Sequence, residues 1–295
     1  MNILYIAYSC NPFAGSEDKI GWCVPYESSK TNKVYVITKK EQREPVEKYL
    51  QSHPLENIKF YYVDIPNFYK KIFKGFMYSG RLNVWNRRVL PLAKKICADQ
   101  KIDIIHQITP IEFRAIGDYG KIANIKFVCG PLGGGESLPN GLKNYAKGHE
   151  IIEVVRSGIN RWYRFKLRIT GKLNRCDYIM FANKETRDFL GLDENFPLVT
   201  EIAADEISIE KKTISNDIND ERVFLFAGRM VYRKGLELLF DAIMEIPDEW
   251  KYIVKIVGDG PDFLHLKHRC ESNSLLSAHV QFMGAVQYSE MQREY

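Results

Sequence analysis

Apolar and polar positions alternate in blocks along the first two hundred residues. Short runs rich in β-branched and aromatic residues are separated by longer stretches with a helical period. The apolar runs cover residues 2–8, 33–38, 58–63, 103–106, 126–129 and 178–182, and each is bounded by Gly, Pro, Asn or clustered charges. Strands that alternate with helices are typical of a parallel sheet wrapped by helices, so the pattern predicts an α/β fold.

The pattern breaks between residues 205 and 222. The segment DEISIEKKTISNDINDER is polar, lacks aromatic residues and has no apolar period, as an exposed connector would. Strand-like runs VFLFAG, YIVKIVG and VQFMG then follow, with helices expected from Lys234, Asp262 and Ser289. A chain of 295 residues exceeds what one core usually organises. We therefore expect two Rossmann-like domains, residues 1–205 and 223–295, joined by a linker over 206–222.

The composition is that of an ordinary globular protein, with 45% hydrophobic and 27% charged residues. The start, MNILYIAY, has neither a basic segment nor a cleavage site, and no apolar run reaches the length of a membrane span. Six scattered cysteines show no metal-ligand spacing with the six histidines, so we expect reduced, buried thiols, no metal site and a cytoplasmic protein.

The first glycine turn, NPFAGSE, follows the first predicted strand. Gly15 and Ser16 precede a helix expected to open at Glu17, so amides and the helix dipole would point outward from the carboxyl edge of the sheet. Such a turn suits a phosphate group. It lacks the GxGxxG fingerprint, which argues against a nicotinamide or flavin dinucleotide. The alternative is a plain turn with Ser16 as the helix N-cap.

A second glycine turn, CGPLGGGES, follows the fifth predicted strand. Consecutive glycines cost backbone entropy, so Gly134 and Gly135 indicate a backbone that approaches a ligand closely, or else a flexible hinge. His106 ends the fourth predicted strand and would place an imidazole at the same rim. A structural histidine that caps the strand is the alternative.

The segment LFAGRMVYRKGLELL carries the sharpest signal. A strand ends at Gly228, and Arg229 and Lys234 flank a short loop that leads into a helix. A guanidinium and an ammonium at a helix start would bind a diphosphate, although a solvated basic loop is also possible. The turn VGDGP adds Gly258 and Gly260 at the same edge.

Taken together, GSE, DIIH, GPLGGGES, AGRMVYRKG, VGDGP and FMG resemble the family 4 retaining glycosyltransferases of the GT-B fold, from the first residue to the last. The resemblance implies two facing Rossmann-like domains. It implies a UDP- or GDP-sugar donor bound mainly by the second domain and an acceptor bound mainly by the first. No metal and no separate cofactor are expected.

Individual roles also follow from the resemblance. Gly15 matches a glycine that faces the donor diphosphate, and His106 matches a histidine beside the donor sugar. Arg229 and Lys234 match a pair that binds the diphosphate and stabilises it as it leaves.

The sequence departs from the family pattern at its end. The family continues with a motif of two glutamates that contacts the donor, whereas Glu290 and Glu294 have the wrong spacing and lie too early. We therefore expect the second domain to be cut short before the donor site is complete.

Positive charge is concentrated in two segments. Residues 156–175 hold seven Lys or Arg and no acid, and residues 68–88 hold six more and no acid, within a chain of net charge +5. In the first segment a helix would place apolar residues on one face and basic residues beside them. The apolar set is Ile159, Trp162, Ile169 and Leu173, and the basic set is Arg161, Arg164, Arg168 and Lys172.

This pattern is typical of an interfacial helix. We expect both basic segments to bind an anionic membrane, placing the protein on the inner face of the cell membrane near a lipid-linked or glycan acceptor. A core-facing helix with a solvated basic face is the alternative, and no nucleic-acid-binding motif accompanies the charge.

Three functions compete. The first is a glycosyltransferase of surface polysaccharide synthesis, and the second is a non-catalytic remnant that binds nucleotide or membrane only. The third is a nucleotide-sugar epimerase or dehydrogenase, for which the dinucleotide fingerprint is missing.

Overall fold

The computed structural model describes residues 1–203, 221–247, 249–287 and 290–291, and confirms an α/β fold with parallel sheets. The chain divides into two compact units. Unit 1 comprises residues 1–137 and 152–205, and unit 2 comprises residues 138–151 and 206–295. Most of the predicted linker and the helix start predicted at Ser289 lie outside the described residues.

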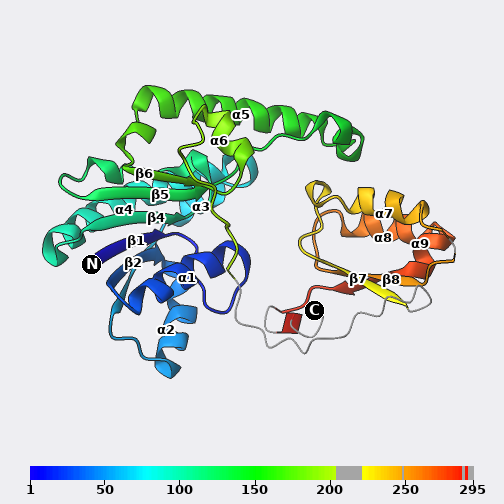
Figure 1. Cartoon of the computed structure of the whole chain (residues 1–295), viewed down its shortest axis with the longest axis horizontal. Helices are drawn as coiled ribbons and strands as arrows, with labels where there is room; N and C mark the ends of the chain where they lie inside the picture. The colour runs from blue at the N-terminus through cyan, green and yellow to red at the C-terminus, as the bar shows by residue number, and fades with distance from the viewer. Residues whose placement is uncertain (204–220, 248, 288–289, 292–295) are drawn as a thin grey trace. The chain divides into compact units, whose positions relative to one another are not determined.

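Unit 1 contains a six-stranded parallel sheet with the order β3-β2-β1-β4-β5-β6, the order of doubly wound Rossmann sheets (Figure 1). The strands are β1 (Asn2–Ala7), β2 (Lys33–Lys39), β3 (Ile58–Val63), β4 (Ile104–Thr109), β5 (Lys126–Leu132) and β6 (Tyr178–Phe181). All six predicted strands are present. β4 and β5 each run three residues further than predicted. In β4 the polar residues Gln107 and Thr109 are buried and pair with β1, so they continue the strand.

Helices cover both faces of this sheet (Figure 1). They are α1 (Ser16–Ser29), α2 (Arg43–Ser52), α3 (Asn67–Ile72), α4 (Tyr78–Gln100), α5 (Glu150–Thr170) and α6 (Lys184–Leu190). Alternate residues of β1 enter different cores. Ile3 and Tyr5 pack with α1 and α2, whereas Leu4 and Ile6 pack with α4, α5 and α6. Burial on both faces explains why these strands appear as unbroken apolar runs.

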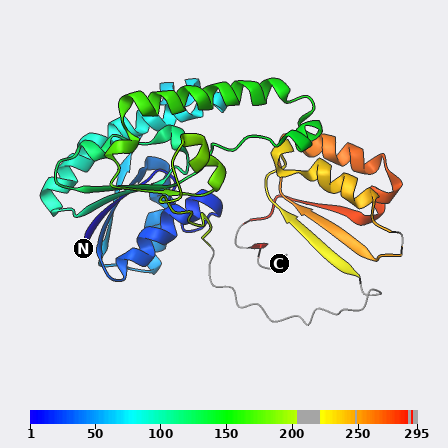
Figure 2. The same ribbon diagram turned by 45° about the horizontal axis from the view of Figure 1, so that its top comes forward.

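Unit 2 contains three parallel strands, β7 (Arg222–Ala227), β8 (Tyr252–Val257) and β9 (Val280–Gly284). The helices α7 (Leu236–Met244), α8 (Phe263–Glu271) and α9 (Ser274–His279) pack on one face of this sheet (Figure 2). α7 begins two residues after the predicted start at Lys234, because residues 232–234 form a tighter 3-10 turn that ends at Gly235. The short helix α9 was not predicted; the side chain of Asn273 accepts a hydrogen bond from the amide of Leu276 at its start.

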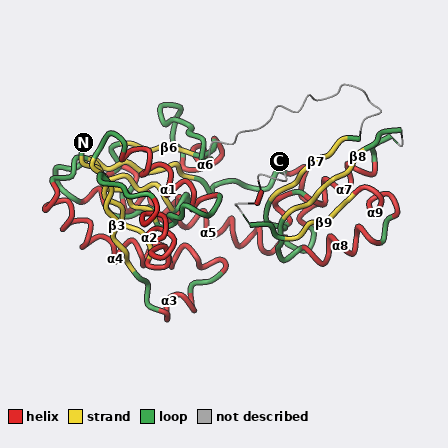
Figure 3. Tube along the Cα trace, turned by 90° about the horizontal axis from the view of Figure 1, so that it is seen from below, coloured by secondary structure: helices red, strands yellow, loops and turns green. Residues whose placement is uncertain are grey.

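In each unit strand and helix alternate along the chain, and the strands of a sheet lie side by side (Figure 3). Among the described residues, no helix combines the length and apolar character needed to cross a membrane. None of the six cysteines, all of which lie in the described ranges, forms a disulfide, and Cys10, Cys97, Cys129 and Cys270 are buried.

Candidate functional site

The strand order of unit 1 reverses between β1 and β4, which is where open α/β sheets bind ligands. Hydrogen bonds connect the segments that follow these two strands. The amide of Ser9 donates to Thr109 Oγ1 at 3.0 Å, and Thr109 Oγ1 donates to the Ser9 carbonyl oxygen at 2.9 Å. The amide of Ile111 donates to Glu17 Oε1 at 2.7 Å. The edge is therefore a fixed surface built from both loops.

The first glycine turn lies at this edge. Gly15 is the N-cap residue of α1, and Ser16 is its first helical residue with φ +56. The alternative role of Ser16 as the N-cap is wrong, because Gly15 takes that position. A non-glycine residue in the left-handed region costs about 1 kcal/mol or more, and such strain persists where the surroundings over-determine it. A helix start leaves its first amides without intrahelical acceptors, and the use of this turn for a phosphate stays a prediction.

Glu17 is a functional candidate that sequence reasoning missed. It belongs to the motif GSE, but it was considered there only as the start of a helix. Its carboxylate accepts from Ile111, as above, and joins α1 to the loop after β4. Burial raises the pKa of Glu17, and the carboxylates of Asp18 and Glu112 raise it further. Glu112 in turn accepts a hydrogen bond from Ser79 and forms an ion pair with Arg114. The edge thus carries carboxyl groups that only the tertiary structure brings together.

His106 does not lie at the rim, so its predicted position is wrong. It is the third residue of β4, and the strand continues to Thr109 because the following residues still pair with β1. Its Nε2 lies 2.8 Å from the carbonyl oxygen of Gly130, and its ring centroid lies 5.4 Å from that of Tyr5. Burial lowers the pKa of His106 to about 4, against the opposing effect of the Gly130 carbonyl. A neutral imidazole therefore supports β5 just before the second glycine turn, and its contact with a donor sugar stays a prediction.

The second glycine turn is held by internal hydrogen bonds. The amide of Gly134 donates to Glu136 Oε1 at 2.9 Å, and the amide of Gly135 donates to Thr186 Oγ1 at 3.0 Å. A Cβ at position 135 would lie 2.8 Å from the Cα of Thr186, so this glycine is required by packing. Arg156 donates to the carbonyl oxygen of Glu136 at 2.8 Å. These two amides are already paired, so their predicted use for phosphate would require these bonds to be exchanged.

Arg229 and Lys234 lie in unit 2, in the loop that follows β7. Arg229 comes directly after Gly228, whose amide donates to the carbonyl oxygen of Val257 at 3.0 Å. Lys234 ends the 3-10 turn and precedes Gly235, the N-cap of the nine-residue helix α7. Both cations are exposed, and neither has a hydrogen bond or ion pair with any residue that the structure describes. Two uncompensated cations on one short loop favour an anionic ligand.

The turn VGDGP supports this loop through its glycines. A Cβ at Gly258 would lie 1.9 Å from the carbonyl oxygen of Gly228, and one at Gly260 would lie 2.2 Å from that of Met230. Gly258 also has φ +141, which side chains rarely adopt. The amide of Gly260 donates to Asp259 Oδ1 at 2.7 Å, within its own turn. These glycines therefore act by packing under the loop that carries Arg229.

A cavity of about 730 Å³ adjoins the same loop in unit 2. It lies between residues 141–149 and the helices α7 and α8. The ring of His149 stacks on that of Tyr232, with centroids 4.2 Å apart. Glu237 Oε1 lies 2.7 Å from His265 Nε2, and the carboxylate of Glu237 pairs with Arg269. Sequence reasoning missed this cavity because its walls come from segments about ninety positions apart, and residues 141–149 form no motif.

Helix α5 presents an apolar stripe to the solvent. Ile151 is 80% exposed, Trp162 55%, Phe165 60% and Ile169 69%. The predicted apolar set is wrong for one residue. Leu173 lies beyond the end of α5 and packs against the core, since the helix stops at Thr170.

The predicted basic stripe is divided as well. Arg161 and Arg168 are exposed, whereas Arg164 lies over the ring of Phe189 at 5.2 Å. Lys172 is half-buried near Asp118. The alternative of a core-facing helix with a solvated basic face holds in part, since α5 packs on the core through Leu167 and exposes Arg161 and Arg168. It does not account for the exposed Trp162 and Ile169, whereas Ile159 is half-buried. Within the described ranges, no group of three or more His, Cys, Asp or Glu side chains could hold a metal ion.

Comparisons with known proteins agree with this architecture. The chain superposes on the lipopolysaccharide outer core galactosyltransferase WaaB with a TM-score of 0.55 and 16% identity, covering 99% of this chain and 70% of that one. For sucrose-phosphate synthase from Thermosynechococcus elongatus the TM-score is 0.56 with 14% identity, covering 100% and 73%. The fold is GT-B. HepE from Anabaena, solved in complex with UDP and glucose, gives a TM-score of 0.52 with 16% identity, covering 97% and 70%.

Sequence comparison adds a match for the C-terminal part of the chain. Residues 208–295 match the family model of Glycosyl transferases group 1. An uncharacterised glycosyltransferase from Methanocaldococcus jannaschii is 25% identical over 154 residues, which is 48% of this chain. The match spans 39% of that relative's own length. The loop with Arg229 and Lys234 lies inside the segment that the family model matches.

Proposed function

We propose that this GT-B protein is a glycosyltransferase that moves a sugar from a UDP- or GDP-sugar to a lipid-linked or polysaccharide acceptor. The observation that carries the proposal is the pair of exposed, uncompensated cations Arg229 and Lys234, within a segment that matches Glycosyl transferases group 1. HepE, which has the same fold and was solved in complex with UDP and glucose, supports a nucleotide-sugar donor.

The two cations supply the chemistry of the leaving group. When the glycosidic bond breaks, negative charge grows on the diphosphate. A guanidinium can donate two parallel hydrogen bonds to it, and an ammonium adds a compact charge. Because the negative charge on the diphosphate grows as the bond breaks, both groups stabilise the transition state more than the ground state. In this proposal the two cations take the role that a metal ion has in other transferases. The acceptor hydroxyl attacks the sugar on the same face that the diphosphate leaves, so the configuration is retained.

Calorimetry with UDP and GDP tests the donor site. Arg229→Ala and Lys234→Ala should each lose a charge-assisted contact of about 1.5–3 kcal/mol, or roughly ten- to over a hundredfold in affinity. Arg233→Ala is the matched control, because Arg233 lies on the same loop and its loss removes the same charge. Equal affinities in all three variants would mean that the loop binds no diphosphate or only attracts it diffusely.

Transfer assays with a panel of sugar nucleotides and a lipid-linked acceptor test the activity itself. Turnover that Lys234→Ala abolishes supports the proposal. Nucleotide binding without any turnover would instead favour the binding-only alternative.

The acceptor side of the proposal involves the membrane. The exposed apolar stripe of α5 is flanked by Arg161 and Arg168, and further large apolar residues are exposed on and beside α3, including Phe68, which is 66% exposed. Apolar groups inserted at the head-group level and cations facing anionic lipid act together in interfacial helices. We propose that this surface of unit 1 holds the enzyme against an anionic membrane that carries its acceptor, on the cytoplasmic leaflet.

A further inference from the structure

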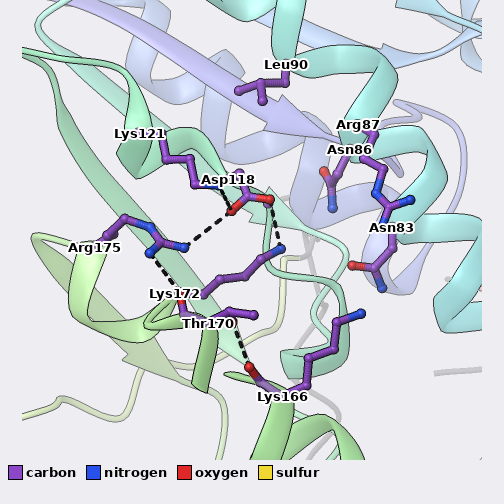
Figure 4. A pocket seen from close by; sticks show the side chains of 11 residues that line it. Asn83, Asn86, Arg87, Leu90, Asp118, Lys121, Lys166, Thr170, Lys172 and Arg175 are labelled. Carbon is purple, nitrogen blue, oxygen red and sulfur yellow. Dashed lines mark hydrogen bonds and ion pairs between the residues drawn. The ribbon is translucent and has the colours of Figure 1, made fainter. Parts of the chain in front are cut away.

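Unit 1 contains a second polar cavity that the glycosyltransferase proposal does not use. It has a volume of about 320 Å³ and lies between α4, residues 117–121 and the end of α5 (Figure 4). Residues 117–121 lead into the start of β5, and Lys172 and Arg175 directly precede β6. The cavity is therefore near the amino ends of these strands, whereas the glycine turns follow the carboxyl ends of β1 and β5.

The charge of the cavity is strongly unbalanced. Its ionisable lining consists of five cations and one carboxylate: Arg87, Lys121, Lys166, Lys172, Arg175 and Asp118. Both basic segments noted in the sequence contribute, since Arg87 belongs to residues 68–88 and three of the others belong to residues 156–175. Residues separated by about ninety positions thus meet at one place, which the separate runs of charge did not predict.

Asp118 is shared by three of the cations. Its carboxylate oxygens lie 3.4 Å from Lys121 Nζ, 3.3 Å from Lys172 Nζ and 3.4 Å from Arg175 Nη2. Lys172 also donates to the carbonyl oxygen of Ile116 at 2.8 Å, and its side chain is only 15% exposed. Burial lowers the pKa of Lys172, and the nearby cations Lys166 and Arg175 lower it further, against Asp118. One carboxylate therefore holds three cations in place without neutralising them.

Arg87 and Lys166 face the same hollow without a counter-ion (Figure 4). Neither has an ion pair with any residue in the described ranges. Lys166 Nζ instead lies over the rings of Trp162 and Tyr163, at 4.9 and 5.6 Å from their centroids. Trp162 belongs to the exposed stripe of α5, so the cavity and the proposed membrane surface share this part of the helix.

We propose that this cavity is a binding site for a phosphate or diphosphate group, held by Arg87 and Lys166 and by the cations gathered around Asp118. A doubly or triply charged phosphate balances the surplus better than a carboxylate does, and a guanidinium pairs with phosphate oxygens through two parallel bonds. The volume is at the lower end of the range for small-ligand sites, roughly 300–1,000 Å³. It suits a head-group-sized ligand, from a lipid or from a free phosphate compound.

Calorimetry with inorganic diphosphate tests the site, in the full chain carrying Arg229→Ala and Lys234→Ala so that the proposed donor site does not contribute. We expect saturable binding of one diphosphate. The double variant Arg87→Gln, Lys166→Gln should bind at least about tenfold more weakly, because it loses two charge-assisted contacts. The matched control is Lys94→Gln, Lys95→Gln, which removes the same charge from exposed positions of α4 outside the cavity.

Asp118→Asn should change the affinity for diphosphate in the opposite direction. Removal of the single carboxylate should tighten diphosphate binding several-fold if the cavity takes an anion. If the cluster is only a structural ion-pair network, the variant should lose thermal stability with no gain in affinity. The proposal is overturned if diphosphate does not bind, or if the cavity and control variants weaken it equally.

Vesicles distinguish the two sources of the phosphate group. Co-sedimentation is measured with phosphatidylglycerol–phosphatidylcholine vesicles and with pure phosphatidylcholine vesicles. The site binds a lipid head group if diphosphate competes with the anionic vesicles and if the cavity variant sediments less than its control. The site binds a free phosphate compound if diphosphate binds the cavity but does not change the binding of the protein to vesicles. Both results are independent of sugar transfer.

Discussion

Gly258 packs so tightly against Gly228 that a Cβ at position 258 would lie 1.9 Å from the carbonyl oxygen of Gly228. The two turns at the carboxyl ends of β7 and β8 are thereby held together, and the loop with Arg229 rests on them. We expect Gly258→Ala to destabilise unit 2 by about 1–3 kcal/mol, since it adds a steric clash and a side chain at φ +141. Urea unfolding measures the loss.

Gly141→Ala is the matched control for that prediction. A Cβ at Gly141 meets no atom within 4 Å, so this variant should unfold at nearly the wild-type urea concentration. If both variants behave alike, close packing of the turns is not what requires glycine at position 258.

Glu17 is expected to stabilise the edge between β1 and β4. Glu17→Ala leaves the amide of Ile111 without its acceptor, which costs about 1–3 kcal/mol in the free energy of unfolding. Glu17→Gln retains an acceptor oxygen and should cost less. Chemical denaturation of the two variants checks this order, and a larger loss for Gln than for Ala would contradict it.

His106 should make the protein less stable in acid. Its pKa is about 4 in the folded state because of burial, against about 6.5 when unfolded. Between these values the unfolded chain binds more protons, so stability falls as the pH decreases from about 6.5 to about 4 and the difference stops growing below that. Between pH 7 and pH 4.5 the expected loss is about 2–3 kcal/mol.

His106→Gln removes this titration while keeping a donor for the Gly130 carbonyl. Urea unfolding at both pH values should show a smaller acid loss for this variant than for the wild type. Identical losses would mean that other groups, such as the carboxylates, account for the whole pH dependence.

The exposed stripe of α5 should contribute to membrane binding through apolar area. Phe165→Ser removes a side chain whose burial is worth about 1.5–3 kcal/mol, so co-sedimentation with anionic vesicles should weaken roughly tenfold or more. Leu264→Ser, on α8 of unit 2, removes an apolar side chain that is 77% exposed and serves as control. Equal behaviour of the two variants would argue against α5 as the docking surface.

The sequence alone determined the strands and their order along the chain. Parallel strands such as β1 are buried on both faces, so they appear as continuous apolar runs that Gly, Pro and Asn terminate. The β3 boundaries match the prediction, because both ends carry such a signal. The loop with Arg229 and Lys234 could be recognised for the same reason, since its glycines and cations are neighbours in the chain.

Tertiary structure decided everything that depends on distant residues. His106 lies inside β4 rather than at its end, because pairing with β1 extends the strand through Gln107 and Thr109. The second glycine turn is closed by Thr186, which lies 51 positions from Gly135 along the chain. Local patterns contain no information about such partners, because the energy of a contact depends on distance in space and not in sequence.

The charges around Asp118 also depend partly on sequence and partly on tertiary structure. Composition revealed two basic segments, and periodicity indicated an amphipathic helix over residues 156–175. Which face of α5 packs on the core, and whether Lys172 faces lipid or a carboxylate, depended on where α4 and residues 117–121 place their side chains. A hydrophobic period shows that a helix has an apolar face, but only the packed neighbours determine whether that face is buried or left exposed for a membrane.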